Sequence, residues 1–132
     1  MPSGSQAAPA SKKMLWAGRI LSAIPVFMLL TSAVAKFVRP APVLEGFAKF
    51  GFAESIIPRL GILELACTVL YLIPRTSVLG AILLTGYLGG ATVTHLRVGD
   101  PAFVGAVILG VLVWGGLFLR DERLRALLPL RT

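Results

Sequence analysis

Residues 56–73 read IIPRLGILELACTVLYLI, an apolar run with a single carboxylic acid, Glu64, near its middle. A membrane-spanning helix needs about 20 residues at 1.5 Å rise per residue. If the helix starts at Ser55, Glu64 lies about 14 Å along an axis that crosses roughly 30 Å of hydrocarbon, close to the midplane. An ionisable group is costly at that depth, so Glu64 marks a candidate functional site.

The composition of the whole chain is that of a membrane protein. Of its 132 residues, 56% are hydrophobic and 14% are charged, and the mean hydropathy is +0.85. A soluble domain carries about a quarter charged residues. Apolar stretches take up most of the chain, at residues 14–37, 55–73, 76–96 and 101–119. They are too long for strands and lack the alternation of an outer-membrane barrel. The sequence therefore predicts an all-α fold, a bundle of four transmembrane helices.

The predicted bundle occupies residues 14–120. A disordered N-terminal tail is expected at residues 1–13 and an amphipathic C-terminal tail at residues 121–132. The first span could also be read as a secretory signal peptide, because Lys12 and Lys13 precede it and Ala33 and Ala35 lie near its end. Its length of more than about 20 residues and the presence of Arg19 favour a retained span.

The basic residues indicate orientation in the membrane rather than nucleic-acid binding. The net charge is +7, but the Lys and Arg residues stand singly or in pairs at the ends of apolar stretches. Four spans place both termini on one side, which collects Lys12, Lys13, Arg19, Arg75, Arg120, Arg123, Arg125 and Arg131. The other side has Lys36, Arg39, Lys49, Arg59 and Arg97. This excess predicts a multi-pass protein of the cell (inner) membrane with both termini cytoplasmic.

The connection between the first two spans, residues 38–54, is predicted to contain a short amphipathic helix. Its apolar side chains alternate with Glu45 and Lys49, which stand four residues apart in the favourable order. The pattern fits a helix anchored at the bilayer surface, and it also fits a lid over a cavity among the spans.

Two helical faces are predicted to point into the bundle. In the second span, Gly61, Glu64, Thr68, Tyr71 and Arg75 follow one another at spacings of three and four residues, so the polar side chains share one face that should avoid lipid. In the third span, small residues repeat every four positions and predict a surface on which another helix packs closely; these are Gly86, Gly90 and Thr94.

Three ionisable residues on different spans are predicted to converge in the outer half of the bundle. Lys36 closes the first span, Glu64 lies in the middle of the second, and His95 lies near the outer end of the third. We take Glu64 and His95 as candidate catalytic residues. Candidate ligand-binding residues are Lys36, Thr68, Tyr71, Thr92 and Arg97.

Each of the three has a structural alternative. Lys36 can extend its ammonium to the headgroups, and His95 can lie at headgroup level. Glu64 can be a neutral acid that is hydrogen bonded to a hydroxyl or a carbonyl. Their convergence on one polar pocket is the hypothesis.

Cys67 is the only cysteine, so the chain has no internal disulfide and no dithiol redox chemistry of its own. The sequence has one histidine and therefore no histidine pair for haem ligation, and no metal site is predicted.

The second and third spans resemble those of the DoxX-like family of small four-helix membrane proteins. The resemblance rests on GILEL at residues 61–65 and YLIPRTSVLGAILLTGYLGGATVTHLR at residues 71–97, and it extends over about residues 15–119. It implies association with a membrane redox system, in which relatives serve as subunits of oxidoreductase complexes. Because this chain lacks a cysteine or histidine pair, it would act there as a quinone site or as a scaffold.

Three functions remain open at this point, and the chain is not assigned as an enzyme. The first is a small subunit of a membrane redox system that binds a quinone or another lipid-soluble molecule near Glu64. The second is a non-catalytic scaffold for redox-enzyme partner subunits or for a homo-oligomer. The third is a stand-alone carrier or acid-base enzyme for an apolar molecule. All three place the chain in the lipid bilayer.

Overall fold

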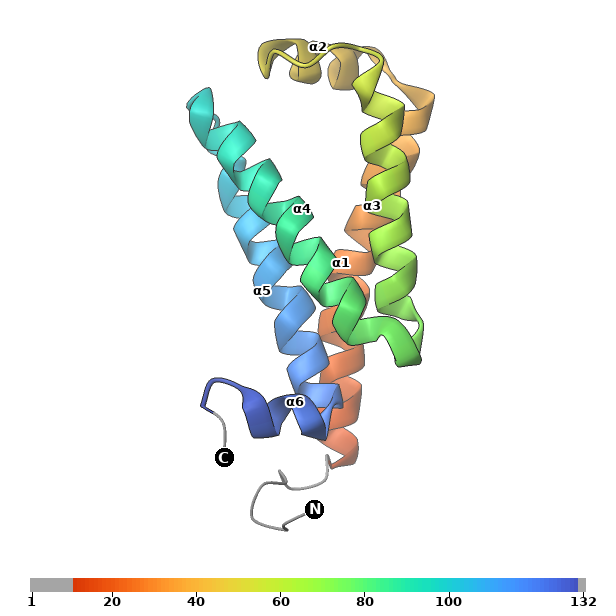
Figure 1. The fold of residues 1–132 in the computed structure, drawn as a ribbon, viewed down its shortest axis with the longest axis vertical. Helices are drawn as coiled ribbons and strands as arrows, with labels where there is room; N and C mark the ends of the chain where they lie inside the picture. Colours follow the sequence, from red (N-terminus) through yellow and green to blue (C-terminus); the bar gives the residue numbers. More distant parts are fainter. Residues whose placement is uncertain (1–10, 131–132) are drawn as a thin grey trace.

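The computed structural model describes residues 11–130, and all regular secondary structure in that range is helical. The elements are α1 (Lys12–Val38), α2 (Ala41–Lys49), α3 (Ile56–Leu72), the 3-10 turn η2 (Pro74–Thr76), α4 (Ser77–Arg97), α5 (Phe103–Arg120) and α6 (Glu122–Leu127). The long helices α1, α3, α4 and α5 form the bundle and α2 lies across one end (Figure 1). The start of α1 and helix α6 lie at the other end, which we call the half that carries the termini (Figure 1). The predicted all-α membrane bundle is confirmed.

Three helical segments within residues 11–130 are long and apolar enough to cross a membrane, namely Lys12–Val38, Pro74–Arg97 and Phe103–Arg120. Helix α3 has 17 residues, so it covers about 26 Å and is shorter than the other spans. The second predicted span, residues 55–73, is thus present as helix α3 of the bundle, but it is not among the segments of span length.

The outer surface of the bundle is apolar. Phe27 on α1, Ile62 on α3, Val93 on α4 and Val111 on α5 are each at least 60% exposed. An apolar surface that extends over four helices is unfavourable in water and matches the hydrocarbon of a bilayer.

The predicted tails are covered only in part. Residues 1–10 and 131–132 lie outside the described residues. Helix α1 already begins at Lys12, where the Ser11 hydroxyl accepts a hydrogen bond from the Met14 N–H at 3.2 Å and caps the helix. Toward the C-terminus, α6 follows Asp121, whose carboxylate caps it by accepting from the N–H groups of Arg123 and Leu124.

The four long helices pack as a ring. Helix α1 packs on α3 and α5, and α4 packs on the same two helices, so α1 and α4 occupy opposite corners. The main core lies toward the half that carries the termini, where Tyr71, Leu84, Val113 and Leu117 are at most 2% exposed. Toward α2, helices α3 and α4 diverge (Figure 1).

The helices approach one another most closely at glycines, but these are not the glycines that the sequence predicted. A Cβ atom added at Gly80 of α4 would come within 3.0 Å of backbone atoms of Tyr71 on α3, and one added at Gly116 of α5 would do so at Ser22 of α1. By contrast, no atom lies within 4 Å of a Cβ at Gly86 or Gly90. The predicted packing role of these two glycines is therefore wrong within this bundle, because their face of α4 borders the space beneath α2.

We expect Gly80→Ala to destabilise the bundle by about 1–3 kcal/mol, because the new methyl group meets backbone that cannot rotate away. Gly89→Ala on the same helix is the matched control, since its Cβ meets nothing within 4 Å and alanine favours the helix. Thermal unfolding in mild detergent measures both. Equal melting temperatures for the two variants would contradict the close α3–α4 contact at Gly80.

Candidate functional site

An ion pair between α1 and α3 lies at the centre of the candidate site. The Lys36 Nζ donates to Glu64 Oε1 at 2.9 Å and to the Ser32 hydroxyl at 2.7 Å. Glu64 is 2% exposed and Lys36 is 8% exposed. The Lys36 ammonium therefore turns into the bundle instead of extending to the headgroups. The helices can approach here because Gly61, one turn before Glu64, faces Lys36 and Phe37 without a side chain of its own.

The polar face of α3 is buried as predicted. Gly61, Glu64, Thr68 and Tyr71 all lie in the interior, whereas Arg75 follows the helix in η2 and is exposed. Ile62 on the opposite side of the helix is 60% exposed. This confirms that the acid faces away from lipid.

A cavity of about 640 Å³ lies between the ion pair, α4 and α2. We call it the α2 cavity. Its polar lining includes Ser32, Lys36, Thr94, His95 and Asp100. Its apolar lining includes Val43, Phe47, Phe50, Phe52, Leu60, Leu63, Gly86, Tyr87, Gly90 and Ala91. The long helices pack closely on one another, whereas α2 packs only loosely on them. Side chains of α2 form the roof of the cavity.

Aromatic rings surround the ammonium group within the α2 cavity. The Lys36 Nζ lies 6.0 Å from the ring centre of Phe47 on α2 and 5.9 Å from that of Tyr87 on α4. Tyr87 also interacts electrostatically with Glu64. Phe47, Phe50 and Phe52 pack on one another with ring centres 5.8–6.4 Å apart. Face and edge contacts of this kind attract cations and flat rings.

His95 lies at the far end of the same cavity. Its Nδ1 is 3.0 Å from a carboxylate oxygen of Asp100, and its ring packs edge-on against Phe50 at 4.8 Å between centres. Hydrogen bonds from the Ala102 N–H and from His95 lower the pKa of Asp100, which lies in the turn after α4. Asp100 is therefore ionised at neutral pH and favours a proton on Nδ1 of His95.

The structure brings some of the predicted site residues together and separates others. Lys36 and Glu64 pair, and His95 borders the same cavity. Arg97 donates to the backbone carbonyl of Phe50 and so joins the end of α4 to the end of α2. Thr68 is buried behind the cavity and donates to the Glu64 carbonyl at 2.7 Å.

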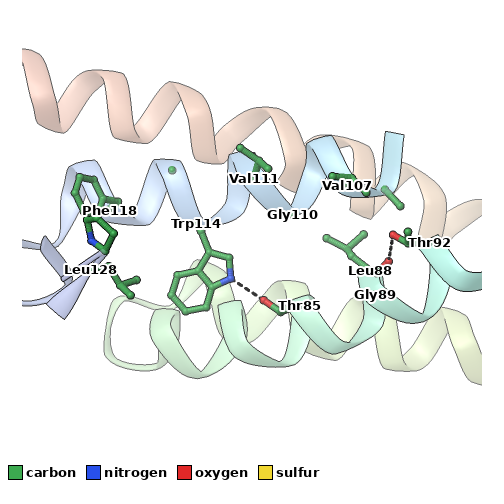
Figure 2. Close-up of a pocket in the computed structure, with 13 residues that line it drawn as sticks. Thr85, Leu88, Gly89, Thr92, Val107, Gly110, Val111, Trp114, Phe118 and Leu128 are labelled. Carbon is green, nitrogen blue, oxygen red and sulfur yellow. Dashed lines mark hydrogen bonds between the residues drawn. The ribbon is translucent and has the colours of Figure 1, made fainter. Parts of the chain in front are cut away.

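Two predicted ligand-binding residues lie elsewhere. The Tyr71 hydroxyl donates to the Val113 carbonyl at 2.6 Å and lies 2.8 Å from the Ser22 hydroxyl, in the core toward the termini. Thr92 donates to the Leu88 carbonyl at 2.7 Å and lines a separate groove between α4 and α5 (Figure 2). In that groove the Trp114 indole donates to Thr85 (Figure 2).

Ser32, Tyr87, Phe47 of α2, and Phe50 and Phe52 just after α2 line the site but were not predicted as site residues. Ser32 stands four residues before Lys36, and Tyr87 stands eight before His95, which places each pair on one helix face. This spacing could have indicated both residues. The positions of the three phenylalanine rings depend on how residues 38–54 fold back over the bundle, and the spacing in this connection fitted a surface anchor as well as a lid.

The geometry defines a helical integral membrane protein with a buried charge pair beside a largely apolar cavity. The chain belongs to the DoxX-like family, whose profile matches residues 20–116. The match contains Lys36, Glu64 and His95. Comparison with curated proteins and with solved structures gives no significant match.

We expect Tyr71→Phe to lower the free energy of unfolding by about 1–3 kcal/mol, because the buried Val113 carbonyl and Ser22 hydroxyl lose a partner. Ligand binding in the α2 cavity should not change, since Tyr71 does not line it. Unfolding and binding measured on one purified sample separate the two effects. A stable Tyr71→Phe variant with weakened binding would show that Tyr71 acts at the ligand site.

Proposed function

We propose that this protein is a small subunit of a membrane redox system and that it binds a quinone, or a similar lipid-soluble carbonyl compound, in the α2 cavity. The observation that carries the proposal is the position of Lys36, which is held by Glu64 and also lines the cavity. An ammonium group has three N–H donors. Ser32 and Glu64 accept two of them within residues 11–130, which leaves one for a ligand oxygen.

The other walls suit a flat and mostly apolar ligand. The volume of about 640 Å³ falls in the range of small-molecule sites, roughly 300–1,000 Å³. The rings of Phe47 and Tyr87 offer stacking surfaces, and Gly86 and Gly90 leave space along α4. Such a site combines apolar walls with a few polar groups that fix orientation, as quinone recognition requires.

The ligand would enter from the membrane. Leu63 lines the α2 cavity and is also 49% exposed on the outer surface of α3. The cavity therefore reaches the lipid-facing side, where α3 and α4 diverge (Figure 1). Helix α2 would act as a lid as well as a surface anchor, since its Phe47 faces the cavity.

Reduction of a quinone to a quinol takes up two electrons and two protons. The electrons would come from a partner subunit, which the redox proposal requires. Asp100 favours the tautomer of His95 with its proton on Nδ1, and Nε2 would then accept and pass on protons at the α2 end. With both termini cytoplasmic, as the basic residues predict, this end faces the outside of the cell.

A substitution that fills the α2 cavity tests the binding proposal and leaves the Lys36–Glu64 ion pair unchanged. We expect Gly90→Leu to weaken binding of a short-chain benzoquinone by at least about tenfold, because the new side chain occupies the α2 cavity. Gly89→Leu adds the same side chain one position along α4, outside that cavity. Titration calorimetry of the protein in lipid nanodiscs measures both affinities.

Tyr87→Phe extends the test to the polar contacts. Loss of this hydroxyl should weaken binding by roughly 0.5–1.5 kcal/mol, about two- to tenfold, if it donates to the ligand.

Unchanged affinity of Gly90→Leu, or no binding by the parent protein, would overturn the quinone proposal. Normal assembly with partner subunits in that case would instead support the scaffold.

A further inference from the structure

A second polar pocket lies in the half of the bundle that carries the termini. It has a volume of about 370 Å³ and lies between α1, α3 and the end of α5. Arg19, Ser22, Tyr71 and Arg120 form its polar lining. The quinone proposal does not use this pocket, which shares no lining residue with the α2 cavity.

Among the residues that the structure describes, the two arginines of this pocket have no acidic partner. Within residues 11–130, the ion pairs are Lys36–Glu64 and His95–Asp100, and no carboxylate lies within 4.0 Å of either guanidinium group of the pocket. The Nε of Arg120 is buried and has no hydrogen-bond acceptor in the same range. A buried donor without an acceptor is costly. Because Arg120 also lines the pocket, an acceptor that enters there would meet a guanidinium group whose donors are not all satisfied.

Each of the two guanidinium groups lies beside an aromatic ring. The Arg19 group lies 5.2 Å from the ring centre of Trp16, and the Arg120 group lies 5.5 Å from that of Tyr71. The Tyr71 ring is itself fixed by the hydrogen bonds of its hydroxyl to Ser22 and Val113. The two guanidinium groups line one pocket and present planar sets of N–H donors, which match the oxygens of a phosphate.

The rest of the pocket is apolar and extends along α1. Beyond the arginines, its lining consists of Ala23, Val26, Phe27 and Leu30 of α1 with Leu72 of α3. From Arg19 to Leu30 the helix rises about 16 Å toward the membrane centre. A ligand of matching shape has an anionic head at the membrane surface and an apolar chain that runs inward.

We propose that this pocket binds an anionic phospholipid, with its phosphate at Arg19 and Arg120 and one acyl chain along Ala23, Phe27 and Leu30. The exposed face of α1 gives the chain direct access from the bilayer, since Phe27 is 72% exposed. The bound lipid would join α1 to the end of α5 at the membrane surface. Free phosphate shares the head-group chemistry but gains nothing from the apolar part.

Native mass spectrometry of the full chain in mild detergent tests the assignment. With added phosphatidylglycerol we expect one retained lipid per chain, and with phosphatidylcholine at the same concentration none. The double variant Arg19→Gln/Arg120→Gln should reduce retention at least about tenfold, because it removes both donors. Arg75→Gln, an exposed arginine near the same end but outside the pocket, is the matched control and should retain the lipid.

Ala23→Phe tests the apolar part with all charges in place. Ala23 is exposed, so the variant folds, and its ring should block the acyl chain and lower retention. Equal loss in Arg75→Gln would show unspecific charge attraction and overturn the proposal. Displacement by millimolar inorganic phosphate together with full retention in Ala23→Phe would assign the pocket to free phosphate and overturn the lipid. Quinone affinity is measured at the α2 cavity, so these lipid-binding results do not depend on whether the quinone proposal holds.

Discussion

The rest of the site depends on the contact between Lys36 and Glu64. Two charges in a bundle surrounded by hydrocarbon are tolerated only if each satisfies the other and the remaining donors find acceptors. Ser32 provides one acceptor, and Tyr87 adds a further polar group beside the carboxyl. This requirement fixes the rotation of α1 and α3 about their axes, because Lys36 and Glu64 must face one another. It also places the ammonium group at the edge of the α2 cavity.

The bundle divides into a packed half and an open half. Toward the termini, Gly80 and Gly116 bring the helices into close contact, and Tyr71 joins α1, α3 and α5 through its hydroxyl. Toward α2, the same glycine-rich helix α4 has Gly86 and Gly90 with no neighbour where a side chain would lie. Small residues thus serve two purposes on one helix, close packing at its start and free volume near its end.

The sequence was sufficient for the class of fold and for the main pair of the site. Apolar runs of span length predicted the helices within one or two residues at most ends, and the polar spacing around Glu64 predicted its inward face. The membership in the DoxX-like family agrees with the resemblance seen in the second and third spans. The roles of Glu64, His95 and the other candidate residues stay predictions.

The predictions that were wrong concern positions whose surroundings depend on how the helices cross, which residue spacing does not determine. Tyr71 shares the polar face of Glu64 but lies two turns farther along α3, where the helices have already closed around it. Thr92 is three residues from His95, yet its side chain faces the α4–α5 groove (Figure 2). The glycine repeat predicted a packed surface because the spacing of small residues in the sequence is the same whether they face a neighbouring helix or a cavity.

The most direct test of the buried ion pair is a double-mutant cycle on the free energy of unfolding with Lys36→Met, Glu64→Leu and both together. Each single variant leaves one buried charge without its partner and should cost about 3–5 kcal/mol, whereas the double variant removes both charges and should cost far less than the sum. A coupling of about 2 kcal/mol or more is the expected result. Effects that add to within about 0.5 kcal/mol would show that the two side chains do not interact, and would contradict the ion pair as the contact that organises the site.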